Sequence, residues 1–282
     1  LMIGLEEGRH GWTQQHVLIL LVIAVLGLVA FIKVEQRAEE PMIPLRLFSN
    51  DIVRTCALLG MCAGAVTYGA GGFLSLYFQD SLLVSPTESG LRTLPQMLGV
   101  TLATFGVGRI IAKTGKYKIF PVIGSALCIV GLLGIAQITG TTPYMFLVIP
   151  MILLGFGTAS VFTTTSIASQ NAVEFSDLGV ATATVLFFRS LGGSFGLAIF
   201  GTVLNSTIRS EIPKRITIEP DKASSIIRSP EQIASLPLAS KQAVVDSLAM
   251  GVSRIYWLCA ATMVIALLLA VILREQPLRL RA

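Results

Sequence analysis

The sequence predicts an all-α integral membrane protein with about seven transmembrane helices. Hydrophobic residues make up 53% of the chain and charged residues only 13%, whereas a soluble domain has about 25% charged residues. The apolar residues gather in blocks of roughly 17–27 residues, long enough for a helix to cross a ~30 Å hydrocarbon layer. A membrane β-barrel would instead show strands of about ten residues with alternating polarity. The blocks lie at about 16–33, 52–79, 90–112, 119–138, 144–169, 180–206 and 254–273.

The polar segments between the blocks divide the chain into predicted regions. The opening run LMIGLEEGRHGW has no basic stretch ahead of a short apolar core, so it does not predict a signal peptide. It is typical of the end of one span followed by a loop, which predicts that the chain starts within a longer protein. We expect an outer-loop remnant at 1–15, an extra transmembrane helix at 16–33, a cytoplasmic linker at 34–51, five bundle helices within 52–208, an extracytoplasmic loop at 209–253, the last helix at 254–273 and a cytoplasmic tail at 274–282.

Basic residues predict which side of the membrane each loop faces. The linker after the first block contains Arg37 and Arg46, the loop after the third contains Lys113 and Lys116, and the tail adds further arginines. The intervening loops QDSLLVSPTESG and TGTTP contain neither Lys nor Arg. Because cytoplasmic loops carry the excess of these residues, we expect the N-terminus outside and the C-terminus in the cytoplasm. The long segment 209–251 has mixed charges, and we expect it outside, with a short amphipathic surface helix near 240–251.

Several function classes are excluded by what the spans lack. The net charge of +5 comes from residues at span ends, which the membrane explains without nucleic acid as a partner. A retinal protein needs a lysine in its last span, and IYWLCAATMVIALLLAVIL has none. An enzyme needs clustered polar groups at facing helix positions, but His10 and His16 are the only histidines and no carboxylate lies mid-span. The four cysteines lack metal-ligand spacing, so we expect core residues and no metal or cofactor.

Small and helix-bending residues inside the spans favour a transporter. The runs TYGAGGF, LGFGTAS and RSLGGSFG place glycines within apolar blocks, and Pro95 and Pro150 also lie inside spans. Such residues let membrane helices approach closely, bend and slide. A transporter that rocks between two states requires these properties.

The run FLSLYFQDSLLVSPTESGLRTLP resembles a signature of the fourteen-span drug:proton antiporter branch of the major facilitator superfamily. In that branch a Tyr and a Gln end one span, Ser-Pro lies in a short loop, and Gly-Leu-x-x-Leu-Pro opens the next span. Leu83 stands where the branch often has a glycine. The matching residues are Tyr77, Gln79, Ser85, Pro86, Gly90, Leu91, Leu94 and Pro95.

The run GRIIAKTGKYK resembles the C-terminal-half copy of the superfamily's loop motif Gly-x-x-x-Asp-Arg-x-Gly-Arg-Arg. Ala112 stands at the aspartate position, so a charge-relay gate built on that carboxylate is not carried over. Basic residues here would anchor two helix ends at the anionic inner leaflet. The matching residues, to which the resemblance gives a gating role, are Gly108, Lys113, Gly115 and Lys116.

Two later runs, LLGFGTASVFTTTSIASQNAV and FFRSLGGSFGLAIFGTVL, are similar to late spans of the same branch, and the resemblance covers roughly Gly11 to Leu204. It implies that the first block is an extra helix and that the other six form the C-terminal six-helix bundle. The implied partners are the lipid bilayer, a small amphipathic substrate, and the missing N-terminal six-helix bundle or a second chain. A proton gradient would supply the energy, with no cofactor.

The architecture of this family places the substrate cavity between two bundles, lined here by the second, third, fifth and sixth blocks. An apolar cavity with a few polar groups suits amphipathic organic cations. The candidate substrate-binding residues are Tyr68, Phe73, Tyr77, Gln96, Thr163, Thr164 and Phe187.

Arg189 is a charge inside a span that needs a physical reason. A charge at bilayer depth costs ~2.5–3.5 kcal/mol on insertion scales, and no span offers a mid-span carboxylate. Arg189 either snorkels to the inner interface or belongs to a gate between bundles, paired with a carboxylate from elsewhere or with helix C-terminal carbonyls. In the second interpretation Gly192, Gly193 and Gly196 let a neighbouring helix close over it.

The sequence therefore predicts the C-terminal part of a proton-coupled efflux transporter that exports amphipathic drugs or toxic organic compounds by alternating access. Two alternatives stay open. One is an exporter of an endogenous metabolite on the same scaffold, and the other is a transport-inactive, half-size membrane partner or scaffold.

Overall fold

The computed structural model describes residues 45–215 and 237–278, together with scattered helical positions between 19 and 34. Within these residues the chain is helical, and six segments are long and apolar enough to cross a membrane; they correspond to the last six of the seven predicted spans. The helices are η1 (Leu45–Ser49), α3 (Asp51–Leu76), the π-helical turn η2 (Tyr77–Ser81), α4 (Pro86–Arg92), α5 (Leu94–Thr114), α6 (Ile119–Ala136), α7 (Tyr144–Asn171), η3 (Phe175–Asp177), α8 (Leu178–Arg215) and α11 (Leu238–Ile272).

Three expected features differ from this description or fall outside it. Most of the first predicted span, 16–33, lies outside the described residues. The predicted loop at 209–253 is much shorter, because α8 continues to Arg215 and α11 already begins at Leu238. The surface helix expected near 240–251 is instead the start of the last span. Val244 and Leu248 are fully buried there, so tertiary packing extends the helix beyond its apolar block.

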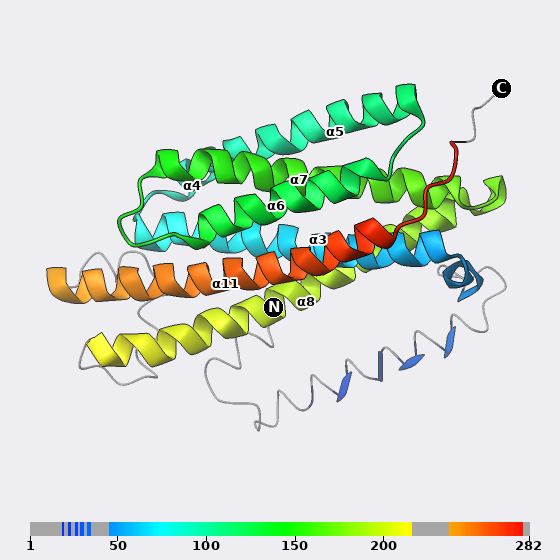
Figure 1. Ribbon diagram of the computed structural model, residues 1–282. Coiled ribbons are helices and arrows are strands. Elements are labelled where there is room, and N and C mark those ends of the chain that lie inside the picture. Colours follow the sequence, from blue (N-terminus) through cyan, green and yellow to red (C-terminus); the bar gives the residue numbers. More distant parts are fainter. Residues whose placement is uncertain are drawn as a thin grey trace.

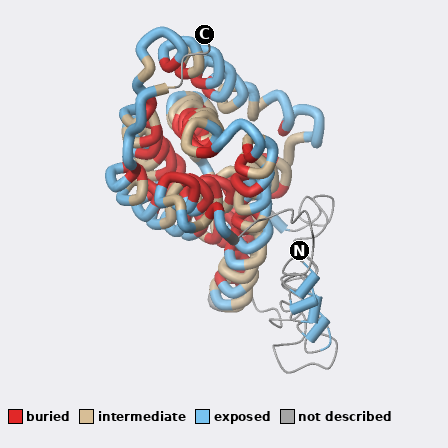
Figure 2. Tube along the Cα trace, turned by 90° about the vertical axis from the view of Figure 1, so that its right-hand side faces the viewer, coloured by how far each residue is buried: buried red, intermediate tan, exposed pale blue. Residues whose placement is uncertain are grey.

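The helices form one bundle in which α3 is central (Figure 1). α3 packs against α8, α7 and α11, while α5 packs against α7 and α6 packs against α7 and α11. In the end-on view of Figure 2 the buried residues lie where helices face one another. We call the side of α3 that carries Tyr68, Gly71 and Ser75 the open face; these positions share one side of the helix because they recur every three or four residues.

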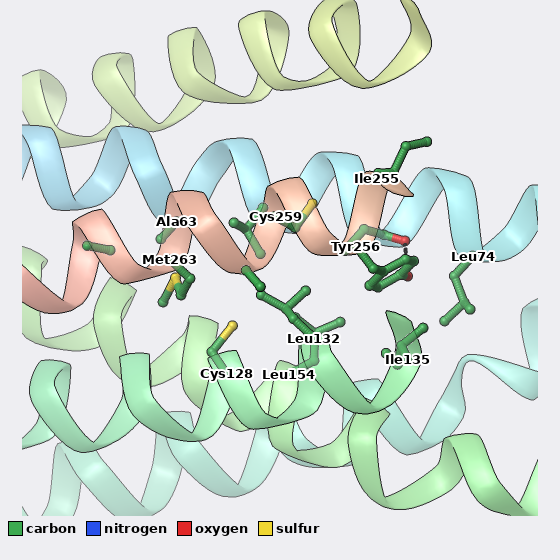
Figure 3. Close-up of a cluster of buried hydrophobic side chains, with 14 of the residues drawn as sticks. Ala63, Leu74, Cys128, Leu132, Ile135, Leu154, Ile255, Tyr256, Cys259 and Met263 are labelled. Carbon is green, nitrogen blue, oxygen red and sulfur yellow. Dashed lines mark hydrogen bonds between the residues drawn. The ribbon is translucent and has the colours of Figure 1, made fainter. Parts of the chain in front are cut away.

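The core lies on the opposite side of α3, where α11 packs, and continues from α11 to α6 (Figure 3). Tyr256 of α11 is fully buried and donates a hydrogen bond from its hydroxyl to the carbonyl oxygen of Ala70 at 2.7 Å. Membrane helices gain little from apolar burial alone, because lipid is as apolar as leucine, so such a bond helps to fix their mutual position. Cys56, Cys128 and Cys259 are fully buried in the same core and Cys62 is half-buried, which confirms the predicted core role of the cysteines.

Glycines bring the backbones of α3 and α8 into direct contact. A Cβ at Gly64 would overlap the carbonyl oxygen of Arg189, and one at Gly192 would overlap the carbonyl oxygen of Met61. The ring of Tyr68 lies on Gly193, and a Cβ at Gly196 would stand 2.8 Å from Cα of Ala65. The neighbouring helix that packs on Gly192, Gly193 and Gly196 is therefore α3 of the same bundle.

Glycines also bring the backbones of α5 and α7 into close contact. A Cβ at Gly99 would overlap the carbonyl oxygen of Ile152, and a Cβ at Gly155 would overlap that of Gln96. Dispersion between closely approaching backbones replaces the hydrophobic effect as the source of attraction between membrane helices. Both pairs of helices that border the open face are thus held by glycine contacts.

The loop between η2 and α4 contains the one non-glycine residue with positive φ in the described part of the chain. It is Leu83, with φ of 52°, at the position where the resembled signature often has a glycine. A side chain in this left-handed region costs roughly 1–2 kcal/mol. Leu83 also packs against the core cluster, which offsets part of that cost.

We expect Gly64→Ala to lower the free energy of unfolding by about 1–3 kcal/mol, because α3 and α8 must separate to admit the methyl group. The measurement is the thermal unfolding midpoint of the purified protein in detergent. Gly106→Ala in α5 is the matched control, since a Cβ there meets nothing within 4 Å. An equal destabilisation by both variants contradicts the close α3–α8 contact.

Candidate functional site

A pocket of about 270 Å³ opens between α3 and α5. Its size approaches that of drug-binding cavities, which start at about 300 Å³. In α3 the hydroxyl of Ser75 lies 2.9 Å from that of Ser89, and the amide nitrogen of Gln79 donates to Ser75 at 3.3 Å. The side chain of Gln96 makes no hydrogen bond with the described residues, so its amide is free for a ligand. The lining residues are Gly71, Ser75, Thr93, Gln96, Met97 and Val100.

Two of the predicted aromatic residues are exposed, one on α3 and one on α8. Tyr68 is 45% exposed although its ring rests on Gly193. Phe187 is 37% exposed and packs edge-on against Phe188, with ring centroids 5.7 Å apart. Two of the predicted substrate residues, Tyr68 and Phe187, thus present exposed rings, and a third, Gln96, lines the pocket.

The other predicted substrate residues lie elsewhere. Tyr77 is fully buried, and its hydroxyl donates to the carbonyl oxygen of Thr139 at 2.8 Å. Thr164 has no exposed surface and its hydroxyl has no partner in the described residues. Phe73 packs against the core. Thr163 is half-buried and faces α5, with its methyl group 4.0 Å from where a Cβ of Gly108 would lie.

Arg189 lies at the open face between α8 and α7. Its backbone is fixed against Gly64, while its guanidinium carbon stands 3.7 Å from the ring centroid of Phe162. A desolvated cation–π contact contributes about 2 kcal/mol, less than the ~2.5–3.5 kcal/mol cost of a charge at bilayer depth. Within the described residues the ring of Phe162 is therefore the partner of Arg189, and it leaves part of the cost uncompensated.

Phe162 was not among the predicted site residues. It stands directly before Thr163 in the run VFTTTS, in which the predicted residues were the threonines. A signal for it existed, because an unpaired arginine within an apolar span needs an aromatic face when no carboxylate is at hand. The sequence could not show which ring is close enough, since Phe162 and Arg189 come from different helices.

The predicted gating loop joins α5 to α6. Gly115 ends α5 with φ of 70°, and its N–H donates to the carbonyl oxygen of Ile111 at 2.8 Å, so this glycine supplies the left-handed residue that closes many helices. Lys113 and Lys116 are exposed and therefore available to solvent or lipid headgroups. Gly108 borders α7 without close contact.

The segment after α11 holds this loop in place. One carboxylate oxygen of Glu275 accepts hydrogen bonds from the N–H groups of Tyr117 and Lys118, at 2.9 and 3.3 Å. The buried hydroxyl of Tyr117 donates to the carbonyl oxygen of Arg274 at 3.2 Å and accepts from the N–H of Gln276 at 2.9 Å. We call residues 274–277 the C-terminal clasp; at its end Asn171 of α7 donates to the carbonyl oxygen of Pro277 at 3.1 Å.

We expect Tyr117→Phe to destabilise the protein by about 1–3 kcal/mol, since the N–H of Gln276 loses its acceptor. Burial raises the pKa of the Tyr117 hydroxyl, the hydrogen bond from Gln276 opposes that rise, and nearby Glu275 adds to it. A raised folded-state pKa means that this stability is complete below the unfolded value, about 10, and is lost as pH rises through the folded value.

Thermal midpoints measured between pH 8 and pH 11 check this expectation. The wild-type midpoint should fall more steeply at the alkaline end than that of Tyr117→Phe. Tyr68→Phe is the control, because the Tyr68 hydroxyl makes no hydrogen bond within the described residues. A pH profile unchanged by Tyr117→Phe rules out the clasp as a source of stability.

Comparison with known proteins places this bundle in a family. The model of the Major Facilitator Superfamily matches residues 9–197. An uncharacterised MFS-type transporter of Mycobacterium tuberculosis is 32% identical over 95% of this chain and 39% of its own length. The multidrug transporter protein MdtP of Bacillus subtilis is 30% identical over 73% of the chain and 38% of its own length. A tetracycline resistance determinant of Streptomyces rimosus is 32% identical over 72% of the chain and 59% of its own length.

The chain thus spans between about two fifths and three fifths of the length of these relatives. The family match extends from the first block into α8, so it includes α3, α5 and α7 and the glycines that join them. The chain belongs to the major facilitator superfamily.

Proposed function

We propose that this chain forms the C-terminal part of a proton-coupled exporter of amphipathic drugs or toxic organic compounds, working by alternating access. The observation that carries the proposal is the open face, where a mostly apolar pocket contains the unpaired amide of Gln96 and the exposed ring of Tyr68 lies one helical turn from Gly71 of its lining. A mostly apolar surface with few polar groups suits amphipathic molecules. Relatives named for multidrug transport and tetracycline resistance support the same substrate class.

The open face would be covered by a second six-helix bundle, from the same protein or from a second chain, with the substrate between the two. α5, α7, α3 and α8 border that face, and α5 is the least buried of the six candidate spans. The lipid bilayer would contact the remaining helices. The positive-inside rule places the Lys113–Lys116 loop and the C-terminal clasp in the cytoplasm, and the N-terminus outside.

A proton gradient would drive export without a cofactor. No Asp or Glu lies between residues 52 and 79, 89 and 173, or 178 and 210, which leaves the middle of five spans without a carboxylate. The coupling proton would therefore bind a carboxylate of the covering bundle. The same lack of acidic groups explains why Arg189 has only an aromatic partner on this side.

Export is tested in cells that lack other drug exporters and produce the protein from its own gene. We expect them to retain less Nile red and less tetracycline than cells without the protein, and a protonophore should abolish the difference. Gln96→Leu should lower the efflux rate about 3–10-fold, the loss of roughly one hydrogen bond.

Gln137→Leu is the matched control, because Gln137 is exposed at the end of α6 and bonds only to its own helix. It should leave efflux unchanged. Equal retention of both compounds with and without the protein contradicts the proposed export, and insensitivity to the protonophore contradicts proton coupling.

A further inference from the structure

The open face carries a positive charge with no ionic partner on the described part of the chain. Arg46, Arg54, Arg92, Arg254 and Arg274 each lie within 3.6 Å of a carboxylate oxygen. Arg189 makes neither an ion pair nor a hydrogen bond with the described residues, and none of its guanidinium nitrogens is fully enclosed. It is therefore held in place and still has all its donors available.

Arg92 shows what a completed arrangement of this kind looks like. Its guanidinium lies 5.5 Å from the ring centroid of Tyr144, and one nitrogen contacts a carboxylate oxygen of Glu88 at 2.6 Å. Arg189 has the ring, at a shorter 3.7 Å from Phe162, but not the anion. A guanidinium stacked by one face keeps its N–H edge free, and that edge matches a carboxylate in a two-point contact.

The position of Arg189 relative to the pocket suits a drug-sized molecule. Arg189 contacts α3 at Gly64, and the pocket contacts α3 at Gly71. Seven residues of helix separate these points, about 10 Å along the axis. The exposed ring of Tyr68 lies between them, so an apolar body could rest on Tyr68 while one end reaches Gln96 and the other reaches Arg189.

We propose that Arg189 is the binding group for a carboxylate of the exported molecule, which makes acids and zwitterions better substrates than permanent cations. This inference rests on the proposed export function and changes its substrate class. The face of Phe162 that would attract an organic cation is occupied by the guanidinium, and a second cation there would be repelled. The organic cations expected from the sequence thus fit this site less well than anionic amphipaths.

A carboxylate could reach Arg189 from two sources, the substrate or another helix of the assembled transporter. The test uses rhodamine B, which carries a free carboxylate, and its ethyl ester, which has the same body without that charge. Dissociation constants are measured by fluorescence anisotropy on the protein purified from membranes of cells that express it from its own gene. We expect wild type to bind the acid about tenfold more tightly than the ester.

Arg189→Gln should remove this preference by weakening binding of the acid while leaving the ester unchanged or tighter. Arg189→Lys keeps the charge but loses the planar fork, so it should retain part of the preference and serves if Arg189→Gln does not fold. Arg92→Gln is the matched control, an arginine that also stacks on a ring but has its own carboxylate, and should keep the full preference.

Four results overturn the proposal. Equal binding of the two dyes by wild type, or an unchanged preference in a folded Arg189→Gln variant, shows that the substrate carboxylate does not reach Arg189, and the export proposal still stands because both dyes bind. A lower thermal midpoint of Arg189→Gln without any change in either dissociation constant assigns the carboxylate to another helix. Failure of wild type to bind either dye removes the open face as a substrate site and overturns both proposals.

Discussion

The contact between the backbones of α3 and α8 is the constraint on which the rest of the bundle depends. A membrane helix cannot rely on expelling water to find its partner, so glycines at the interface must allow direct approach. Gly64 and Gly192 each lie against a carbonyl oxygen of the opposite helix. This contact fixes the backbone of Arg189 over α3 and seats the ring of Tyr68 on Gly193. The packing of the bundle and the chemistry of its open face are therefore set by the same residues.

Charge is distributed along the bundle in a consistent way. Near the helix ends, arginines pair with carboxylates, as Arg46 does with Asp177 and Arg92 does with Glu88. There water and lipid headgroups screen the charge that these ion pairs do not neutralise. Beside the middle of α3, farther from the helix ends, Arg189 has an aromatic face in place of an anion. The middle of the bundle is thus the place where one ligand charge has the largest effect.

Much of the fold follows from the sequence because length and hydropathy act locally. Six apolar blocks become six spans, and Gly115 ends α5 at the predicted loop. The start of α11 could not be predicted, since residues 238–253 are polar enough to read as a loop and are helical because Val244 and Leu248 pack in the core.

The candidate site was predictable only in part, because exposure depends on neighbours from other helices. Tyr68 and Phe187 are exposed and Gln96 lines the pocket, whereas Tyr77 turns inward to bond Thr139. The partner of Arg189 depended on the approach of α7 to α8, which no local pattern encodes. For Leu83 the local sequence was informative. The resembled signature often has a glycine at this position, and the residue has positive φ in the structure.

The burial of the cysteines makes this chain well suited to site-directed labelling. Thiols of Cys56, Cys128 and Cys259 have no accessible surface, so a water-borne maleimide reaches none of them while the bundle is folded. Only Cys62 is half-buried, and replacing that one residue leaves a protein without a reactive thiol. A single cysteine introduced on the open face would then report its own accessibility to solvent, because the three buried native cysteines would not react.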